Sequence, residues 1–278
     1  MMRLALLFPL LCAFGASAQE GTPIHPYLEN KYYASLGWFK PQQGLSLGLD
    51  ASIDPPELGP APYVDFSQKF GMTSTDDSFS AEIGWRFGTK WQLRGQYFRV
   101  DNNSRATLEE TIEWGDVEYT AGTTVAAGTD MQITRLFFGR TFRSNEKREF
   151  GLGVGGHILD LEAFISGDAF LDGENIGFRK ERASISQPLP NIGAWYMHAF
   201  DQNWAAYLRF DWLAANVDTY DGRIINASAS VGYVIGDHVG LALAYNFFEI
   251  DLGVDDSSWQ GRAKIRFDGP SLSITGYW

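Results

Sequence analysis

Apolar and polar residues alternate along most of this chain with a period of two. Between residues 79 and 87 every odd position is apolar and every even position is small or charged. The same alternation continues over residues 91–97, 204–212, 225–235 and 259–267. Because successive side chains of a β-strand point to opposite faces, this repeat predicts strands with one apolar and one polar face.

The lengths of these segments indicate a membrane rather than a soluble sheet. They run for 9 to 14 residues, which matches the roughly 9–11 residues of a tilted membrane strand and exceeds the roughly 5–6 residues usual in soluble sheets. Trp85, Trp91 and Trp204 stand beside short connections. A girdle of aromatic side chains belongs at that level of an outer-membrane barrel.

The connections alternate in length. Short turns at 88–90, 201–203 and 236–238 alternate with longer polar stretches at 101–130 and 166–187. Short periplasmic turns and longer extracellular loops are typical of outer-membrane barrels. We therefore predict an all-β fold, an antiparallel transmembrane β-barrel with this arrangement of turns and loops.

The strand count follows from four hairpins and two end segments. The hairpins are 79–88 with 90–100, 131–142 with 149–163, 189–200 with 203–217, and 223–235 with 238–250. The end segments, 31–53 and 258–278, each switch their apolar face once, at 41–44 and 268–270. A face switch implies one inserted residue, in a bulge or a turn. Bulges give ten strands, which we predict. Turns give about twelve with a further strand at 63–70, and eight is the other even alternative.

The two ends of the chain predict export and membrane assembly. Residues 1–18 resemble a secretory signal peptide, with Arg3, an apolar run and a small-residue site at 16–18. Cys12, the only cysteine, lies within it. Residues 19–30 form a short N-terminal tail and residues 31–278 the barrel. Apolar and polar residues alternate up to the last residue, Trp278. We interpret this terminal aromatic residue as a signal read by the barrel-assembly machinery.

The composition of the chain restricts the classes of molecule that it could bind. With 22 Lys and Arg against 34 Asp and Glu, the net charge is −12, which argues against nucleic acid because a groove binder needs a basic face. Hydrophobic residues make up 45% of the chain, which excludes a disordered protein. No stretch reaches the ~18–20 apolar residues of a membrane helix. The expected location is the outer membrane, and the expected partners are its lipid and lipopolysaccharide.

Charged residues on the polar face are the candidates for lining the barrel interior. They are Glu82, Arg86, Arg94, Arg135, Arg209, Asp211, Arg262, Lys264 and Arg266. A lumen of this size is usually a packed core of salt bridges. The three cations of the last strand favour instead a narrow aqueous path with anion preference. Both interpretations stay open.

Catalytic chemistry finds little support in the sequence. None of the four histidines is followed two positions later by a serine, as in the outer-membrane lipid-modifying enzymes. Four histidines without a usable cysteine argue against a structural metal site. The glycine-rich run at 151–156 lacks a following helix and a Lys-Ser/Thr pair, so it is better explained as strand than as a phosphate loop. We expect no cofactor, no metal and no enzymatic activity.

Three stretches resemble a known group of proteins. They are residues 240–248 with 255–256 and 266–270, residues 151–161, and residues 218–222. Together they are similar to a group of uncharacterised Gram-negative outer-membrane β-barrel proteins, over about residues 31–278. The resemblance implies a fold and a location, and it carries no functional residue. We expect a barrel with a structural or surface-interaction role, with a narrow solute channel as the alternative and a lipid-modifying enzyme third.

Overall fold

The structure is a computed structural model that describes residues 24–49, 63–72, 78–114, 117–171, 173–217, 220–256 and 259–278. The predicted signal peptide lies outside the described residues. The elements are α1 (Pro26–Glu29), β1 (Tyr32–Phe39), β2 (Gln42–Leu49), β3 (Tyr63–Asp65), α2 (Phe66–Lys69), β4 (Ser78–Phe87), β5 (Trp91–Thr107), β6 (Ile112–Trp114), β7 (Val117–Tyr119), β8 (Thr124–Ser144), β9 (Arg148–Leu171), β10 (Glu174–Ala199), β11 (Trp204–Val217), β12 (Tyr220–Ile235), β13 (Val239–Asp256) and β14 (Trp259–Tyr277). Within these ranges, neither short helix is long enough to cross a bilayer.

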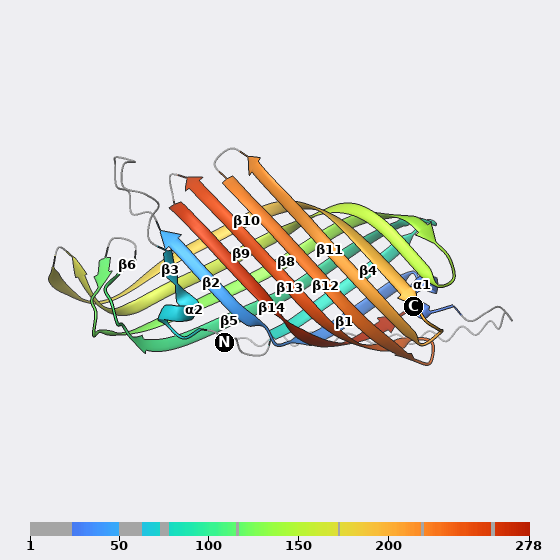
Figure 1. Cartoon of the computed structure of the whole chain (residues 1–278), viewed down its shortest axis with the longest axis horizontal. Helices are drawn as coiled ribbons and strands as arrows, with labels where there is room; N and C mark the ends of the chain where they lie inside the picture. Colours follow the sequence, from blue (N-terminus) through green and yellow to red (C-terminus); the bar gives the residue numbers. More distant parts are fainter. Residues whose placement is uncertain are drawn as a thin grey trace, which may run out of the picture.

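The strands close into an antiparallel barrel (Figure 1). The order is β1-β4-β5-β8-β9-β10-β11-β12-β13-β14, and β14 pairs back with β1. β1 and β2 behave as one strand, because both pair with β14 in one register, from Phe39 opposite Ser271 to Gln42 opposite Asp268. Pro41 interrupts the ladder between them since proline has no N–H to donate. The predicted all-β barrel of ten strands is confirmed.

The predicted insertions at the two face switches are wrong. β13 and β14 pair without a register shift over the whole of β14. Ile265 and Phe267 point inward and are buried, and Thr275 of the same parity is also buried. Leu272 and Ile274, of the opposite parity, are exposed. The strand keeps its faces, and what changes along it is which face is apolar.

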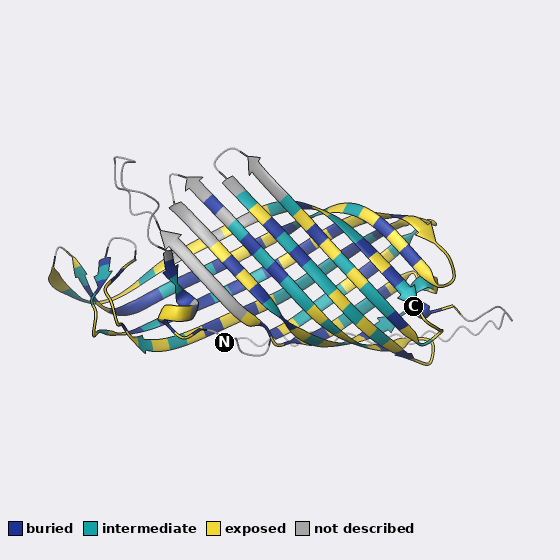
Figure 2. Ribbon diagram, in the orientation of Figure 1, coloured by how far each residue is buried: buried dark blue, intermediate teal, exposed yellow. Residues whose placement is uncertain are grey.

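This change divides the barrel into two parts. In the membrane segment, near the short turns, the outward residues are apolar and exposed, as Leu136, Leu208 and Leu243 show. In the extension, at the far end, the inward residues are apolar and buried. Figure 2 shows the alternating bands of exposure along the strands. An apolar outer face suits lipid, whereas an apolar inner face is the core of a structure surrounded by water.

The extension is built from strands rather than loops. β8, β9 and β10 have 21, 24 and 26 residues. A strand of that last length is about 85 Å long, and even at a tilt of about 40° it rises about 65 Å, against an apolar band of about 25 Å. The sequence-based assignment of 101–130 and 166–187 to long loops is therefore wrong. Most of 166–187 continues β9 and β10, and residues 101–107 and 124–130 of the other stretch continue β5 and β8.

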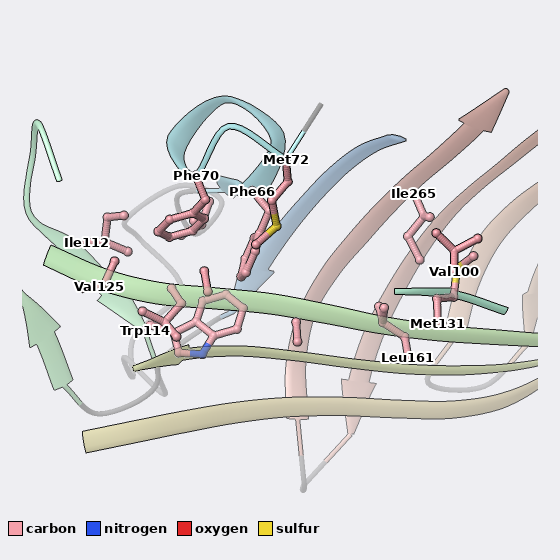
Figure 3. Packing of buried hydrophobic residues seen from close by; sticks show 14 of the residues in the cluster. Phe66, Phe70, Met72, Val100, Ile112, Trp114, Val125, Met131, Leu161 and Ile265 are labelled. Atoms are coloured by element: carbon pink, nitrogen blue, oxygen red, sulfur yellow. The ribbon is translucent and has the colours of Figure 1, made fainter. Parts of the chain in front are cut away.

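A hydrophobic core fills the extension (Figure 3). The strands contribute Val100, Met131, Leu161 and Ile265 among others. The segment from β3 through α2 to residue 72 and the β6–β7 hairpin add a large aromatic group, which consists of Phe66, Phe70, Trp114 and Tyr119. The Ser104 hydroxyl donates to the carbonyl of Phe70 at 2.5 Å, which ties this segment to β5. The far end of the barrel is thus occupied by packed side chains.

Candidate functional site

The candidate site is the polar interior of the membrane segment. Six of the nine predicted lumen residues point into it, from β4, β5, β8 and β11: Glu82, Arg86, Arg94, Arg135, Arg209 and Asp211. The alternation places them there, because a strand with an apolar face toward lipid must turn its other face inward. These side chains form two hydrogen-bonded clusters.

The first cluster is centred on an ion pair in the middle of the barrel. Arg135 Nη2 lies 2.7 Å from Asp211 Oδ1, and the two side chains are 2% and 0% exposed. Asn226 Nδ2 lies 3.4 Å from Asp211 Oδ2 and 3.1 Å from Nε2 of His157. Arg209 Nη2 donates to Asn226 Oδ1 at 3.4 Å. The cluster joins β8, β9, β11 and β12 across the interior.

Glu82 extends this cluster to the opposite wall. Its carboxylate accepts hydrogen bonds of 2.6 Å from the Tyr33 hydroxyl and from Gln96 Nε2. Arg209 Nη1 lies 3.8 Å from the same carboxylate. Charge-assisted hydrogen bonds of this kind keep a carboxylate satisfied away from bulk water.

The second cluster lies closer to the short turns. Arg86 makes a two-point contact with Glu149, at 2.5 and 3.1 Å, and the indole of Trp195 donates to the same carboxylate at 2.7 Å. Arg94 bonds to the Gln92 side chain and donates to the Tyr27 hydroxyl at 2.6 Å. Glu149 was missed by the sequence analysis. The alternation of β9 was the signal that could have found it, since odd positions of that strand point inward.

The predicted N-terminal tail closes this end of the barrel. α1 follows His25, whose side chain accepts from the backbone N–H of Tyr27. Tyr27 and Leu28 pack against Met197, Ala199 and Ala205, and the Arg86 guanidinium lies 4.4 Å from the centre of the Tyr27 ring. Within the predicted tail, residues 24–30 therefore pack against the barrel interior, and we call this segment the plug.

Burial lowers the pKa of His25, which lies in the plug and outside the strands. The carboxylate of Asp201 and the backbone of Asn203 act in the opposite direction and are the weaker influences. Asp201 belongs to a short turn, and hydrogen bonds from the backbone N–H groups of Trp204 and Asn203 lower the pKa of its carboxyl group. The plug is therefore most compatible with a neutral imidazole.

A cavity of about 230 Å³ remains between the plug and the core of the extension. Hydroxyl and amide side chains form much of its wall, including Ser80, Ser228, Ser273 and Asn246. Arg135, His157 and Arg209 lie on one side of it. Apolar side chains form the rest of the wall, and the space is large enough for several waters or a small solute.

Two of the three predicted inward cations of the last strand, Lys264 and Arg266, are not inside. The Arg266 side chain is 53% exposed and pairs with Asp268 on the outer surface, and Lys264 is also exposed. Both belong to the extension, where the polar face is the outer one, so their placement in the lumen is wrong. Arg262 pairs with Gly253 and Gly48 through its backbone, and its side chain lies outside the described residues.

Trp278, the predicted assembly signal, sits at the seam between the first and last strands. Its backbone N–H donates to the carbonyl of Tyr32, and its carbonyl accepts from the N–H of Tyr32. The two rings stack with centroids 6.3 Å apart, and the indole is more than half exposed. Its role in assembly stays a prediction.

All four histidines of the chain are described, and none lies at the far end of the extension. His25, His198 and His238 are at the plug end, and His157 is in the middle of the barrel. Among the described residues there is no group of three or more His, Cys, Asp or Glu side chains that could hold a metal ion.

Comparison with solved structures fits this architecture. The outer membrane protease OmpT from Escherichia coli aligns with a TM-score of 0.55 at 10% identity, over 93% of this chain and 99% of that one. The chain has the fold of an outer-membrane β-barrel. Ail, the attachment invasion locus protein of Yersinia pestis, covers 89% of this chain at 11% identity and a TM-score of 0.36. The toluene transporter TodX of Pseudomonas putida covers 91% at 8% identity and a TM-score of 0.36. No protein-family model and no curated protein matches the sequence.

Proposed function

We propose that the protein is an integral outer-membrane barrel, closed to solutes, that carries a folded extension at the cell surface for contact with other molecules. One observation carries this proposal: the apolar face passes from the outside to the inside of the barrel partway along its strands. The inversion is what a barrel needs if its lower part is in lipid and its upper part stands in water.

The narrow solute channel is the less favoured alternative. A path through the described interior would have to pass the plug, the Arg135–Asp211 pair and the core of the extension. Lys264 and Arg266 cannot give such a channel anion selectivity, because both lie on the outer surface. An enzymatic role is no part of the proposal, because no catalytic grouping among the described residues supports one.

The tip of the β9–β10 hairpin is the part of the extension best suited to contact. Phe178 is 70% exposed there, with Leu171 also exposed and the cations Arg179 and Lys180 beside it. Exposed apolar side chains on a water-facing structure commonly mark an interaction surface.

Single cysteines test the topology, since Cys12 in the predicted signal peptide is the only native one. Ser184→Cys in the extension should react with a membrane-impermeant maleimide on intact cells, whereas Thr89→Cys in a short turn should react only after the outer membrane is opened. Equal labelling of both in intact cells would overturn the proposed orientation.

Conductance measurements test whether the barrel is closed. Purified protein in planar bilayers should give no discrete conductance steps, and steps from the wild-type chain would restore the channel.

A photo-reactive residue in place of Phe178 tests the contact role. Adducts should form on intact cells from position 178 and be absent from the same residue in place of Ile265, which is buried in the core. Absence of adducts at both positions would remove the hairpin tip from any contact surface.

A further inference from the structure

The hydrogen-bonding groups around the interior cavity are unbalanced toward donors. Six buried atoms of residues in the cavity wall lack a partner: Nε and Nη1 of Arg135, Nε of Arg209, Nδ1 of His157, Nε2 of His25 and the hydroxyl of Tyr207. The two guanidinium groups offer only N–H donors. Nε2 of His157 faces the Asn226 amide nitrogen, so Nε2 accepts and the ring proton is on Nδ1. The cavity therefore calls for a group that accepts several hydrogen bonds.

The charges of the same region are also unbalanced. Four guanidinium groups point into the membrane segment, and the carboxylates among the described inward residues are Glu82, Glu149 and Asp211. Those three each face an arginine. The fourth arginine, Arg94, is buried against neutral groups: the Gln92 amide, the Tyr27 hydroxyl, and the rings of Trp195 and Tyr207. A buried positive charge without a counter-charge is strongly unfavourable.

We propose that the cavity binds one small monovalent anion, held by Arg135 and Arg209. The excess of one positive charge sets the charge of the ligand, and the free donors of the wall supply its hydrogen bonds. Arg94 lies within electrostatic range of Arg135, so an anion at Arg135 also offsets the unpaired guanidinium. The volume of about 230 Å³ exceeds that of a halide, so a halide would share the site with water, and a small carboxylate could occupy it in place of the halide.

Crystals of the full chain soaked in bromide provide the direct test. Data at the bromine absorption edge should show an anomalous peak in the cavity, at hydrogen-bonding distance from a nitrogen of Arg135 or Arg209. A cavity that holds only water under these conditions would overturn the proposal.

Stability in detergent provides a second readout. At equal ionic strength, the unfolding midpoint should be higher in chloride than in a bulky anion such as gluconate. The folding constant should approach a tenfold rise for each tenfold rise in chloride once the site fills. Arg209→Gln leaves three arginines against three carboxylates, and it should abolish this chloride dependence.

Arg266→Gln is the matched control, because it removes one arginine from the outer surface and should keep the full chloride dependence. If the wild type shows no dependence, or if Arg209→Gln keeps it, the anion site is excluded. If Arg209→Gln does not fold, the bromide experiment on the wild type still decides.

Discussion

Replacement of Gly151 in β9 by alanine should destabilise the protein, because the Trp195 ring occupies the space of a side chain at this position. A β-carbon at Gly151 would overlap three atoms of the indole. The ring cannot move aside easily. Its N–H donates a hydrogen bond to Glu149, and the Arg94 guanidinium lies 5.0 Å from the ring centre. The opposite edge of the ring packs against Gly139 on β8, where a β-carbon would lie only 2.6 Å from the ring.

The magnitude follows from the cost of overpacking. An added carbon in a well-packed interior costs about 1–3 kcal/mol, and the fixed ring places Gly151→Ala near the upper end. At about 2–4 °C for each kcal/mol in a chain of this size, the midpoint should fall by about 4–10 °C. The shift can be measured by heating samples to increasing temperatures before a denaturing gel and following the disappearance of the band of the folded barrel.

Gly232 in β12 is the matched control. It also lines the interior, but a β-carbon there would meet its nearest neighbours at 3.4 and 3.6 Å, which is ordinary contact. Gly232→Ala should change stability by less than about 0.5 kcal/mol. In a Trp195→Phe background the Gly151→Ala penalty should shrink, because phenylalanine lacks the overlapping atoms. Equal stability of the Gly151 and Gly232 variants would refute the assignment of the ring.

Three further predictions concern the plug, the seam and the outer surface. Because burial lowers the pKa of His25, its contribution to plug stability is fully present above the ordinary value of about 6.5 and is lost as the pH falls through the lowered value. The protection of the amides of residues 27–30 against hydrogen exchange, corrected for the intrinsic pH dependence of the exchange rate, should therefore be lower at pH 5 than at pH 7. A difference that persists in His25→Gln would contradict this cause. Trp278→Asp should reduce membrane levels far more than Trp91→Asp, measured by outer-membrane fractionation, and equal levels would remove Trp278 from the assembly signal. Lys264→Gln combined with Arg266→Gln should lower the free energy of unfolding, measured by denaturant titration, by less than about 1 kcal/mol, as expected for exposed charges. A larger loss would place these side chains in the interior after all.

The alternation along the chain was sufficient to predict the barrel. The count of ten strands was also right, although the inserted residues on which it rested are absent. A period of two is a local property of the backbone, so the sequence shows which residues share a face. Once the membrane segment is recognised, the lipid-facing side is also known. That reasoning correctly placed Arg94, Arg135 and Asp211 inside.

The same pattern could not show where the membrane ends. Alternation looks alike whether the apolar face meets lipid or a protein core, so the extension was mistaken for loops, and Lys264 and Arg266 were assigned to the wrong face. Burial there depends on whether a second layer of side chains covers the apolar face. That layer comes from the distant residues 63–72, 112–114 and 117–119.

The plug was equally invisible in the sequence. Residues 24–30 are too few to show a period, and nothing local distinguishes them from a solvated tail. Tyr27 is held by Arg86 and Arg94, which the chain supplies about sixty residues later. The sequence by itself determined the strands and their faces, because these follow from backbone geometry. Only the tertiary structure decided what each face touches, because that depends on segments brought together by closure of the barrel.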